Sequence, residues 1–154
     1  NHPVACPPQW LPVILAANIP VPTSNGRRRL ARVFTTKADL KTALGEYNDN
    51  ATVAIEKYDG PPNTWDVSDI TDMKQLFKDL DTINANISSW NTSGVTTMED
   101  MFRDAKKFNQ PLNFDTAKVT TMEGMFEGAS EFNQPLDFAD TSSVTTIYFM
   151  FYSA

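Results

Sequence analysis

Few side chains in this sequence are of the kinds that carry out chemistry, and their numbers limit what that chemistry can be. The chain has one histidine, His2, and one cysteine, Cys6, both close to its first residue. This excludes a mechanism that needs an internal histidine, an internal disulfide, and a metal site built from several cysteines. Nineteen acidic residues remain, but no nucleophile–base pair, metal set or phosphate loop singles any of them out. We therefore expect no catalytic residues, no cofactor and no metal.

Oxygen-bearing side chains recur in two series along the second half of the chain. The first series is Asp66, Asn91, Asp115 and Asp140, and the second is Asn84, Asn109 and Asn133. A ladder of such oxygens would suit calcium, but the dense Asp-x-Asp-Gly spacing of calcium loops is absent. We favour the alternative, in which each side chain caps a turn within its own unit.

Both series belong to a repeat that must position them. Residues 108–129 (FNQPLNFDTAKVTTMEGMFEGA) are followed by a similar stretch, 132–154 (FNQPLDFADTSSVTTIYFMFYSA). Aligned apolar positions recur four times at intervals of 25, 24 and 25 residues, a period typical of leucine-rich-repeat-like arrays. We predict that these positions form one continuous core: Ile70, Met73, Phe77, Val95, Met98, Met101, Phe102, Phe108, Leu112, Val119, Met122, Met125, Phe126, Phe132, Leu136, Val144 and Phe151.

Each unit reads as a helix half and an extended half. In the second unit, apolar residues fall at i, i+3, i+4 and i+7, which predicts a short helix: Met98, Met101, Phe102 and Ala105. Thr96 precedes Glu99 by three residues, as in a capping box, and Thr120 precedes Glu123 in the same way. The alternating PLNF and PLDF stretches predict short strands. The predicted fold is therefore α/β, a leucine-rich-repeat-like solenoid of 24–25-residue strand–helix coils with an N-terminal helical cap.

The chain divides into three parts. Residues 1–33 form an extended N-terminal arm, because prolines break its apolar stretch WLPVILAANIPVP, which is too short to span a membrane. Residues 34–62 form a cap with a helix that begins after Thr36 and stops at residues 48–50, followed by a strand over 52–58. Residues 63–154 hold the four repeat units, of which the last is incomplete.

Net charge disfavours some partners. The chain carries −6 in total, and residues 63–154 hold fourteen acidic against six basic residues. Such a surface repels nucleic acid and anionic membranes, so we expect neither as a partner. Three Asn-x-Ser/Thr sequons, at Asn50, Asn86 and Asn91, are candidate glycosylation sites of an extracellular or cell-surface protein.

The segment WNTSGVTTMEDMFRDAKKFNQPL, residues 90–112, resembles the repeat of BspA-like surface proteins, also known as the mycoplasma DUF285 family. The lead-in over residues 34–58 and the motif at residues 65–68 resemble the segment before such arrays. The resemblance covers residues 34–154, although the last two units lack the tryptophan. It implies an exported leucine-rich-repeat-like protein used in adhesion, protein binding or extracellular assembly, and it brings no catalytic residues.

Two functions follow from these patterns. The first is a non-catalytic extracellular or cell-surface repeat protein that mediates adhesion or binds a protein or glycan. The alternative is a subunit of a self-assembling extracellular fibre or sheath, in which the arm of one copy covers the open end of the next. No lid follows the last unit, so we expect either that more repeats continue in the native protein or that another chain covers this end. Candidate assembly contacts are Trp10, Ile14, Leu15, Tyr148, Phe149 and Tyr152.

Overall fold

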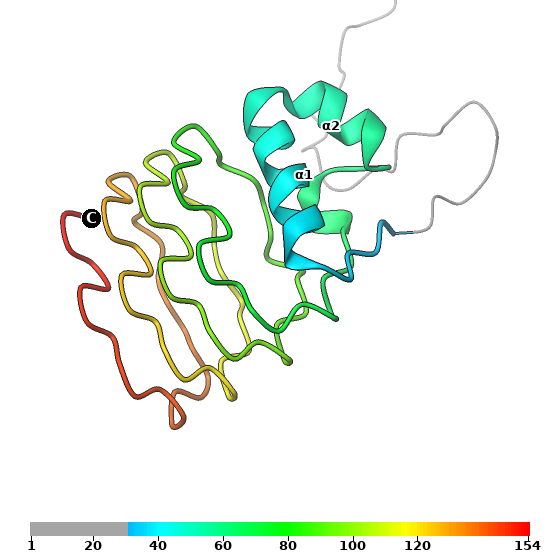
Figure 1. Ribbon diagram of the computed structural model, residues 1–154. Coiled ribbons are helices and arrows are strands. Elements are labelled where there is room, and N and C mark those ends of the chain that lie inside the picture. Colours follow the sequence, from blue (N-terminus) through cyan, green and yellow to red (C-terminus); the bar gives the residue numbers. More distant parts are fainter. Residues whose placement is uncertain (1–30) are drawn as a thin grey trace, which may run out of the picture.

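The computed structural model describes residues 31–154, in which helices come first and loops fill the rest (Figure 1). Helix α1 spans Lys37–Asp49, α2 spans Ala51–Lys57, and the 3-10 helix η1 spans Pro62–Thr64. Nearly all of the predicted arm lies outside the described residues, including the candidate contacts Trp10, Ile14 and Leu15. Within residues 31–154, no helix has the length and apolar character that crossing a bilayer requires.

Helix α1 begins after Thr36, the residue that the sequence predicts as its N-cap. The Thr36 side chain accepts a hydrogen bond from the backbone N–H of Asp39 at 3.2 Å, and so satisfies a donor that has no partner inside the helix. One face of α1 is buried and consists of Leu40, Ala43 and Leu44. This face covers one end of the core.

The strand predicted over residues 52–58 is wrong, because this segment forms α2. Asn50 ends α1 and also caps α2, where its side chain accepts a hydrogen bond from the N–H of Val53 at 3.2 Å. The β-branched Thr52, Val53 and Ile55 suggested a strand, but an asparagine cap at the right position outweighs that weak preference. Lys57 on α2 then pairs with Glu46 on α1 at 2.7 Å and ties the two helices together.

The predicted α/β leucine-rich-repeat-like solenoid of strand–helix coils is also wrong. Between residues 65 and 154 the structure has no α-helix and no extended strand. Pairing in the described chain is limited to isolated parallel bridges, such as Asp72 with Thr97 and Thr97 with Thr121. The PLNF and PLDF stretches contribute one such bridge, between Leu112 and Leu136, instead of strands.

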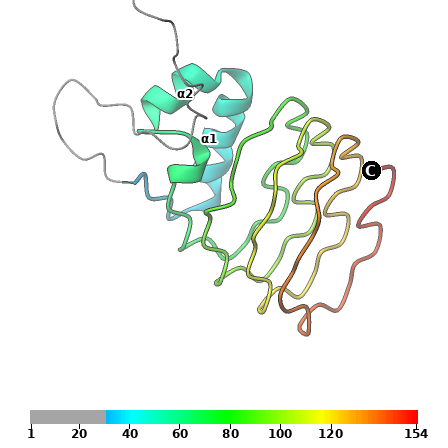
Figure 2. The ribbon, with the colours of Figure 1, turned by 180° about the vertical axis from the view of Figure 1, so that it is seen from behind.

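Four loop segments instead lie side by side, and we call them turn segments: residues 70–80, 95–105, 119–129 and 144–154. α1 lies beside the first, and the fourth lies at the opposite end (Figures 1 and 2). Within each segment, short turns close between residues three apart, such as Met101 N–H to Met98 O at 3.2 Å. Each segment after the first is also bonded to the one before it, 24 or 25 residues earlier.

Backbone dihedrals explain why these segments are not helices. Two residues in each turn segment, four positions apart, have a positive φ of 53–68°. They are Gln75 and Asp79, Asp100 and Asp104, Gly124 and Gly128, and Phe149 and Ser153. A left-handed residue at every fourth position interrupts an α-helix. Two successive four-residue turns still place positions i, i+3, i+4 and i+7 on one side, so the sequence pattern imitated a helix.

The predicted capping boxes are absent because the turn segments form no helix that Thr96 or Thr120 could cap. Thr96 does not bond to the start of a helix; its hydroxyl donates to the carbonyl of Thr71 at 3.1 Å. Thr120 donates in the same way to the carbonyl of Thr96 at 3.1 Å. These threonines therefore join neighbouring segments.

Aromatic rings stack through the core along the row of turn segments. The ring of Phe102 lies 4.8 Å from that of Phe77. On its other side it lies 5.4 Å from the ring of Phe126, and the planes of Phe102 and Phe126 are 3° apart. Most of the predicted core positions are buried: Ile70, Met73, Phe77, Val95, Met98, Met101, Phe102, Phe108, Leu112, Val119, Met122, Met125 and Phe126. Towards the fourth segment the cover thins, and Phe132, Leu136 and Val144 are partly buried while Phe151 is exposed.

The two series of oxygen-bearing side chains have different roles. In the first series each oxygen caps its own turn, as predicted; Asp66 accepts from the N–H and hydroxyl of Ser68 at 3.0 and 2.7 Å. The second series differs from the prediction, because Asn84 Oδ1 accepts from Asn109 N–H, 25 residues away, at 3.0 Å. Cross-segment bonds of this kind hold the row of segments in register.

Candidate functional site: an exposed aromatic end

The fourth turn segment carries an apolar patch that we call the terminal surface. It consists of Ile147, Tyr148, Phe149, Phe151 and Tyr152, whose side chains are 49–63% exposed. In the described part of the chain, the other large exposed apolar residues are Val33 and Val53, which belong to the opposite end. The fourth turn segment, which carries this patch, lies at the end of the row that is farthest from α1 and α2 (Figure 2).

Local backbone geometry presents these rings to solvent. Phe149 has φ 56° and stands where earlier segments have Gln75, Asp100 and Gly124. A bulky side chain rarely adopts this conformation, which carries a cost in backbone strain. The ring of Phe149 lies 4.1 Å from that of Tyr148 and 5.4 Å from that of Tyr152, which joins the three into one cluster.

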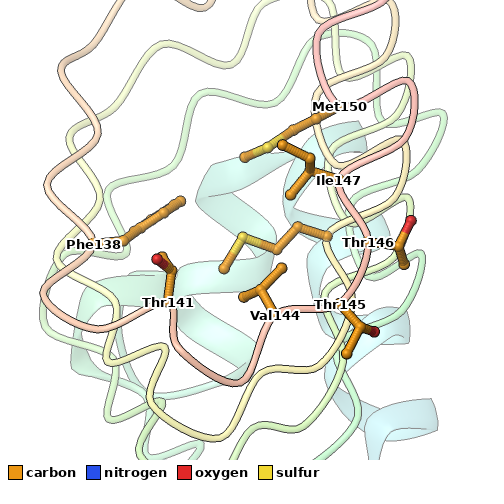
Figure 3. A pocket seen from close by; sticks show the side chains of 8 residues that line it. Phe138, Thr141, Val144, Thr145, Thr146, Ile147 and Met150 are labelled. Atoms are coloured by element: carbon orange, nitrogen blue, oxygen red, sulfur yellow. The ribbon is translucent and has the colours of Figure 1, made fainter.

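An apolar hollow of about 340 Å³ lies next to the terminal surface, where the core is uncovered. Its lining consists of Met122, Phe138, Thr141, Val144, Thr145, Thr146, Ile147 and Met150. Phe138 approaches from one side, with Val144 and Met150 facing it from the fourth segment, whereas the side chains of Thr145 and Thr146 point outward (Figure 3). The hollow is therefore lined by side chains of both the third and the fourth turn segments, together with Phe138 and Thr141.

The backbone of the fourth segment forms hydrogen bonds with the third segment, but some of its N–H groups have no partner among residues 31–154. The carbonyls of the fourth segment accept from the third, for example Tyr148 O from Gly124 N–H at 2.8 Å and Met150 O from Phe126 N–H at 2.9 Å. The N–H groups of Ile147, Phe149, Phe151 and Ser153 have no acceptor among residues 31–154. An exposed row of unpaired donors is a ready template for another chain.

Two acidic side chains near this end, Asp140 and Glu127, are engaged in local bonds. The backbone N–H of Ser142 donates to Asp140 at 2.8 Å, and this bond, with the Ser142 hydroxyl, lowers the pKa of the Asp140 carboxyl. Glu127 pairs with Arg103 at 3.0 Å in the neighbouring segment. Within residues 31–154, no group of three or more His, Cys, Asp or Glu side chains is placed to hold a metal ion.

The predicted assembly contacts Tyr148, Phe149 and Tyr152 are brought together here. The remaining parts of the surface are the exposed Ile147 and Phe151, the hollow, and the row of N–H groups. The sequence analysis predicts Phe151 as a core position and does not include Ile147 among the candidate contacts. A sequence signal for these residues exists, since Ile147 continues the apolar column of Met73, Met98 and Met122, and Phe151 that of Phe77, Phe102 and Phe126.

The three sequons lie on the described surface. Asn50, Asn86 and Asn91 are all exposed. The side-chain oxygen of Asn86 accepts from the Ser88 hydroxyl at 2.9 Å, and Asn91 bonds to Ser93 in the same way at 2.8 Å. Glycosylation at these positions stays a prediction.

Comparison with known proteins identifies the family. No curated protein and no solved structure gives a significant match to the chain. A family model described as "Mycoplasma protein of unknown function, DUF285" matches residues 28–154, which include both helices and all four turn segments. The match covers most of the chain, and the protein therefore belongs to the DUF285 family.

Proposed function

We propose that this protein is a non-catalytic extracellular or cell-surface protein that mediates adhesion by binding a protein or glycan. The observation that supports this most is the terminal surface. Contiguous exposed apolar patches are uncommon on monomeric proteins and mark interaction sites. Tyrosine and phenylalanine are also enriched at the centres of protein interfaces, where they bury a large area at a low cost in side-chain entropy.

A protein partner suits this surface better than a glycan. The unpaired N–H groups of Ile147, Phe149, Phe151 and Ser153 fall on alternate residues. A partner backbone offers carbonyls at a regular spacing that can match such a row, as in strand addition to an exposed edge.

Buried polar groups support the non-catalytic part of the proposal, because they serve the scaffold. The Thr92 hydroxyl donates to Asp115 O at 3.1 Å and accepts from Asp115 N–H at 2.8 Å. The Thr116 hydroxyl donates to Asp140 O at 2.5 Å, and Asp100 accepts from the Gln75 amide at 3.2 Å. Each of these groups joins one segment to another.

Truncation of two exposed rings tests the proposal. Tyr148→Ser combined with Tyr152→Ser removes side chains that are 63% and 60% exposed, so the fold should persist. We expect binding to a panel of extracellular proteins and glycans, measured by surface plasmon resonance, to weaken at least about tenfold.

Val53→Ser is the matched control, because Val53 is an apolar residue with 56% exposure on α2, at the other end. Its binding should equal that of the original chain. Unchanged binding of the Tyr148/Tyr152 variant to its partner would contradict the proposal.

A second candidate function is a subunit of an extracellular fibre, and the uncovered end supports it. Copies cannot add by placing the first turn segment of one on the fourth of another, because α1 occupies that position. Lys41 Nζ donates to Gln75 O at 2.7 Å, and Lys37 pairs with Asp72 at 2.9 Å. A fibre would therefore depend on residues 1–33. A polymer that still forms after deletion of residues 1–26, as seen by negative-stain microscopy, would rule out this connection.

A further inference from the structure

One series of backbone hydrogen bonds between turn segments has the same polarity in every pair of neighbours. In each pair, the earlier segment donates from alternate N–H groups and the later segment accepts with alternate carbonyls. Met98 N–H donates to Thr121 O at 3.0 Å, and Met122 N–H donates to Thr146 O at 3.0 Å. Alternate N–H groups of the first, second and third segments thus each have acceptors in the next segment, and the exposed N–H groups of the fourth segment are the next members of this series.

A threonine bond runs in the opposite direction with the same regularity. Thr120 donates its N–H to Thr96 O at 2.9 Å and its hydroxyl to the same oxygen at 3.1 Å. Thr145 binds Thr120 O in this way through its N–H at 2.8 Å and its hydroxyl at 3.0 Å. The carbonyl of Thr145 is the next member of this series and has no donor among residues 31–154.

A third series is formed by asparagine. Asn84 Oδ1 accepts from Asn109 N–H and Gln110 Nε2, both at 3.0 Å. Asn109 Oδ1 accepts from Asn133 N–H at 3.0 Å and Gln134 Nε2 at 2.9 Å. Asn133 is exposed, and its Oδ1 has no such donor in the described chain.

We propose that the terminal surface binds a polypeptide segment with this protein's own repeat pattern, aligned parallel to the fourth turn segment. The inference rests on the proposed binding function and names the partner. An Asn-Gln pair in that segment binds Asn133 Oδ1, and a threonine binds Thr145 O. Alternate carbonyls after this threonine accept from the N–H row, as in T-T-M-x-x-M-F.

The aromatic stacks support the same register. Phe108 stacks on Phe132 at 6.2 Å, and Phe126 stacks on Phe151 at 5.6 Å. The next phenylalanines of the pattern would cover the outer faces of Phe132 and Phe151, while its apolar residues enter the hollow of about 340 Å³. Each apolar and polar feature of this end then finds the kind of group that it meets elsewhere in the molecule.

Two other occupants fit less well. A second copy that docks through its own terminal surface would bring one donor row against another, which leaves N–H groups without acceptors. The apolar stretch over residues 10–22, WLPVILAANIPVP, contains neither an Asn-Gln pair nor a T-T-M sequence.

A synthetic peptide copying residues 106–129 tests the inference on the full chain. It contains the Asn-Gln pair and the T-T-M-x-x-M-F stretch in the required order. Amide hydrogen exchange, read by NMR, should slow at least about tenfold at Ile147, Phe149, Phe151 and Ser153 when the peptide is added. Met150 and Tyr152 should change less, because their N–H groups are already bonded within the segment, at 3.1 and 3.0 Å.

The matched control is the same peptide with Met122→Asp and Phe126→Asp, which keeps the polar pattern but cannot enter the hollow; we expect no protection from it. The inference is overturned if the repeat peptide gives no protection, or if a peptide copying residues 8–24 protects equally well. It is also overturned if protection appears without peptide as the concentration of the chain rises, since that indicates self-association.

These outcomes separate the inference from the proposed function. If the Tyr148/Tyr152 variant loses partner binding but the repeat peptide gives no protection, the inference fails and the proposed function stands. If the peptide protects but the variant binds its extracellular partner normally, the proposed function fails and the inference stands.

Discussion

The ring of Phe126 lies flat against the ring of Phe151, with centroids 5.6 Å apart and planes 2° apart. Phe126 is fully buried, because Phe102 covers its other face at 5.4 Å. Phe151 has the same position in its own segment, yet 53% of it is exposed. One repeated position is thus buried in the third segment and exposed in the fourth.

This difference predicts unequal costs of truncation. Phe126→Ala should lower the free energy of unfolding by about 3–5 kcal/mol, the usual range for a buried phenylalanine. Phe151→Ala should cost less than about half as much, because it loses only one packed face. Urea denaturation followed by circular dichroism measures both, and equal losses would show that the fourth segment is covered in solution.

A pair of glycines tests the left-handed positions. Gly124 has φ 57°, and a Cβ added there would collide with Asp100 Oδ1, so Gly124→Ala should destabilise the protein by more than about 1 kcal/mol. Gly45 lies inside α1 with open space around it, so Gly45→Ala should stabilise the protein by about 0.5–1 kcal/mol. Melting temperatures should therefore shift in opposite directions; a downward shift in both would contradict this account.

Alanine substitutions in the second series of asparagines should also have unequal effects on stability. Asn109→Ala removes an oxygen that accepts two hydrogen bonds from the next segment, and should cost about 1–3 kcal/mol in unfolding free energy. Asn133→Ala removes an oxygen without such partners and should stay within about 0.5 kcal/mol of the original chain. A large loss for Asn133→Ala in the isolated protein would show that its oxygen already has a partner.

Acid should destabilise the protein through the turn-capping aspartates. The hydroxyl and then the backbone N–H of Ser68 lower the pKa of Asp66, and Ser142 lowers the pKa of Asp140. A carboxyl whose pKa is lower in the folded state contributes its stability above its unfolded pKa of about 3.9, and loses it as the pH falls through the folded value. The urea concentration at the midpoint of unfolding should therefore decrease when the pH is lowered below about 4.

Asn91 supplies the control for this pH dependence, because it caps the corresponding turn without a charge and accepts from Ser93 N–H at 3.1 Å. Asp66→Asn combined with Asp140→Asn should keep the turns and flatten the acid loss. An equally steep loss in this double variant would assign the pH dependence to other groups.

The sequence patterns predicted which positions are buried better than they predicted the backbone conformation of the repeat. The apolar period located the buried positions, because burial depends on which residues recur. The period did not distinguish a helix from two successive turns, since both place Met98, Met101 and Phe102 on one side. The distinguishing signal was the column of Gln75, Asp100 and Gly124: Asp and Gly tolerate a positive φ better than most residues do.

The candidate site was predictable in part for a related reason. The sequence analysis predicts Tyr148, Phe149 and Tyr152 as contacts because they are apolar residues of the last repeat unit. The unpaired N–H row and the open Asn133 oxygen depend on which segments lie next to each other in space. Asn84 meets Asn109 across 25 residues, and no local rule for turns foretells such a bond.

The first turn segment is bonded to Lys37 and Lys41 and packs near the buried face of α1, whereas among residues 31–154 the fourth has a neighbouring turn segment on one side only. Opening of the chain should therefore begin at residues 144–154 and move towards α1, one segment at a time. A protease added under native conditions would then shorten the protein in steps of 24 or 25 residues, and its fragments would record the order in which the layers come apart.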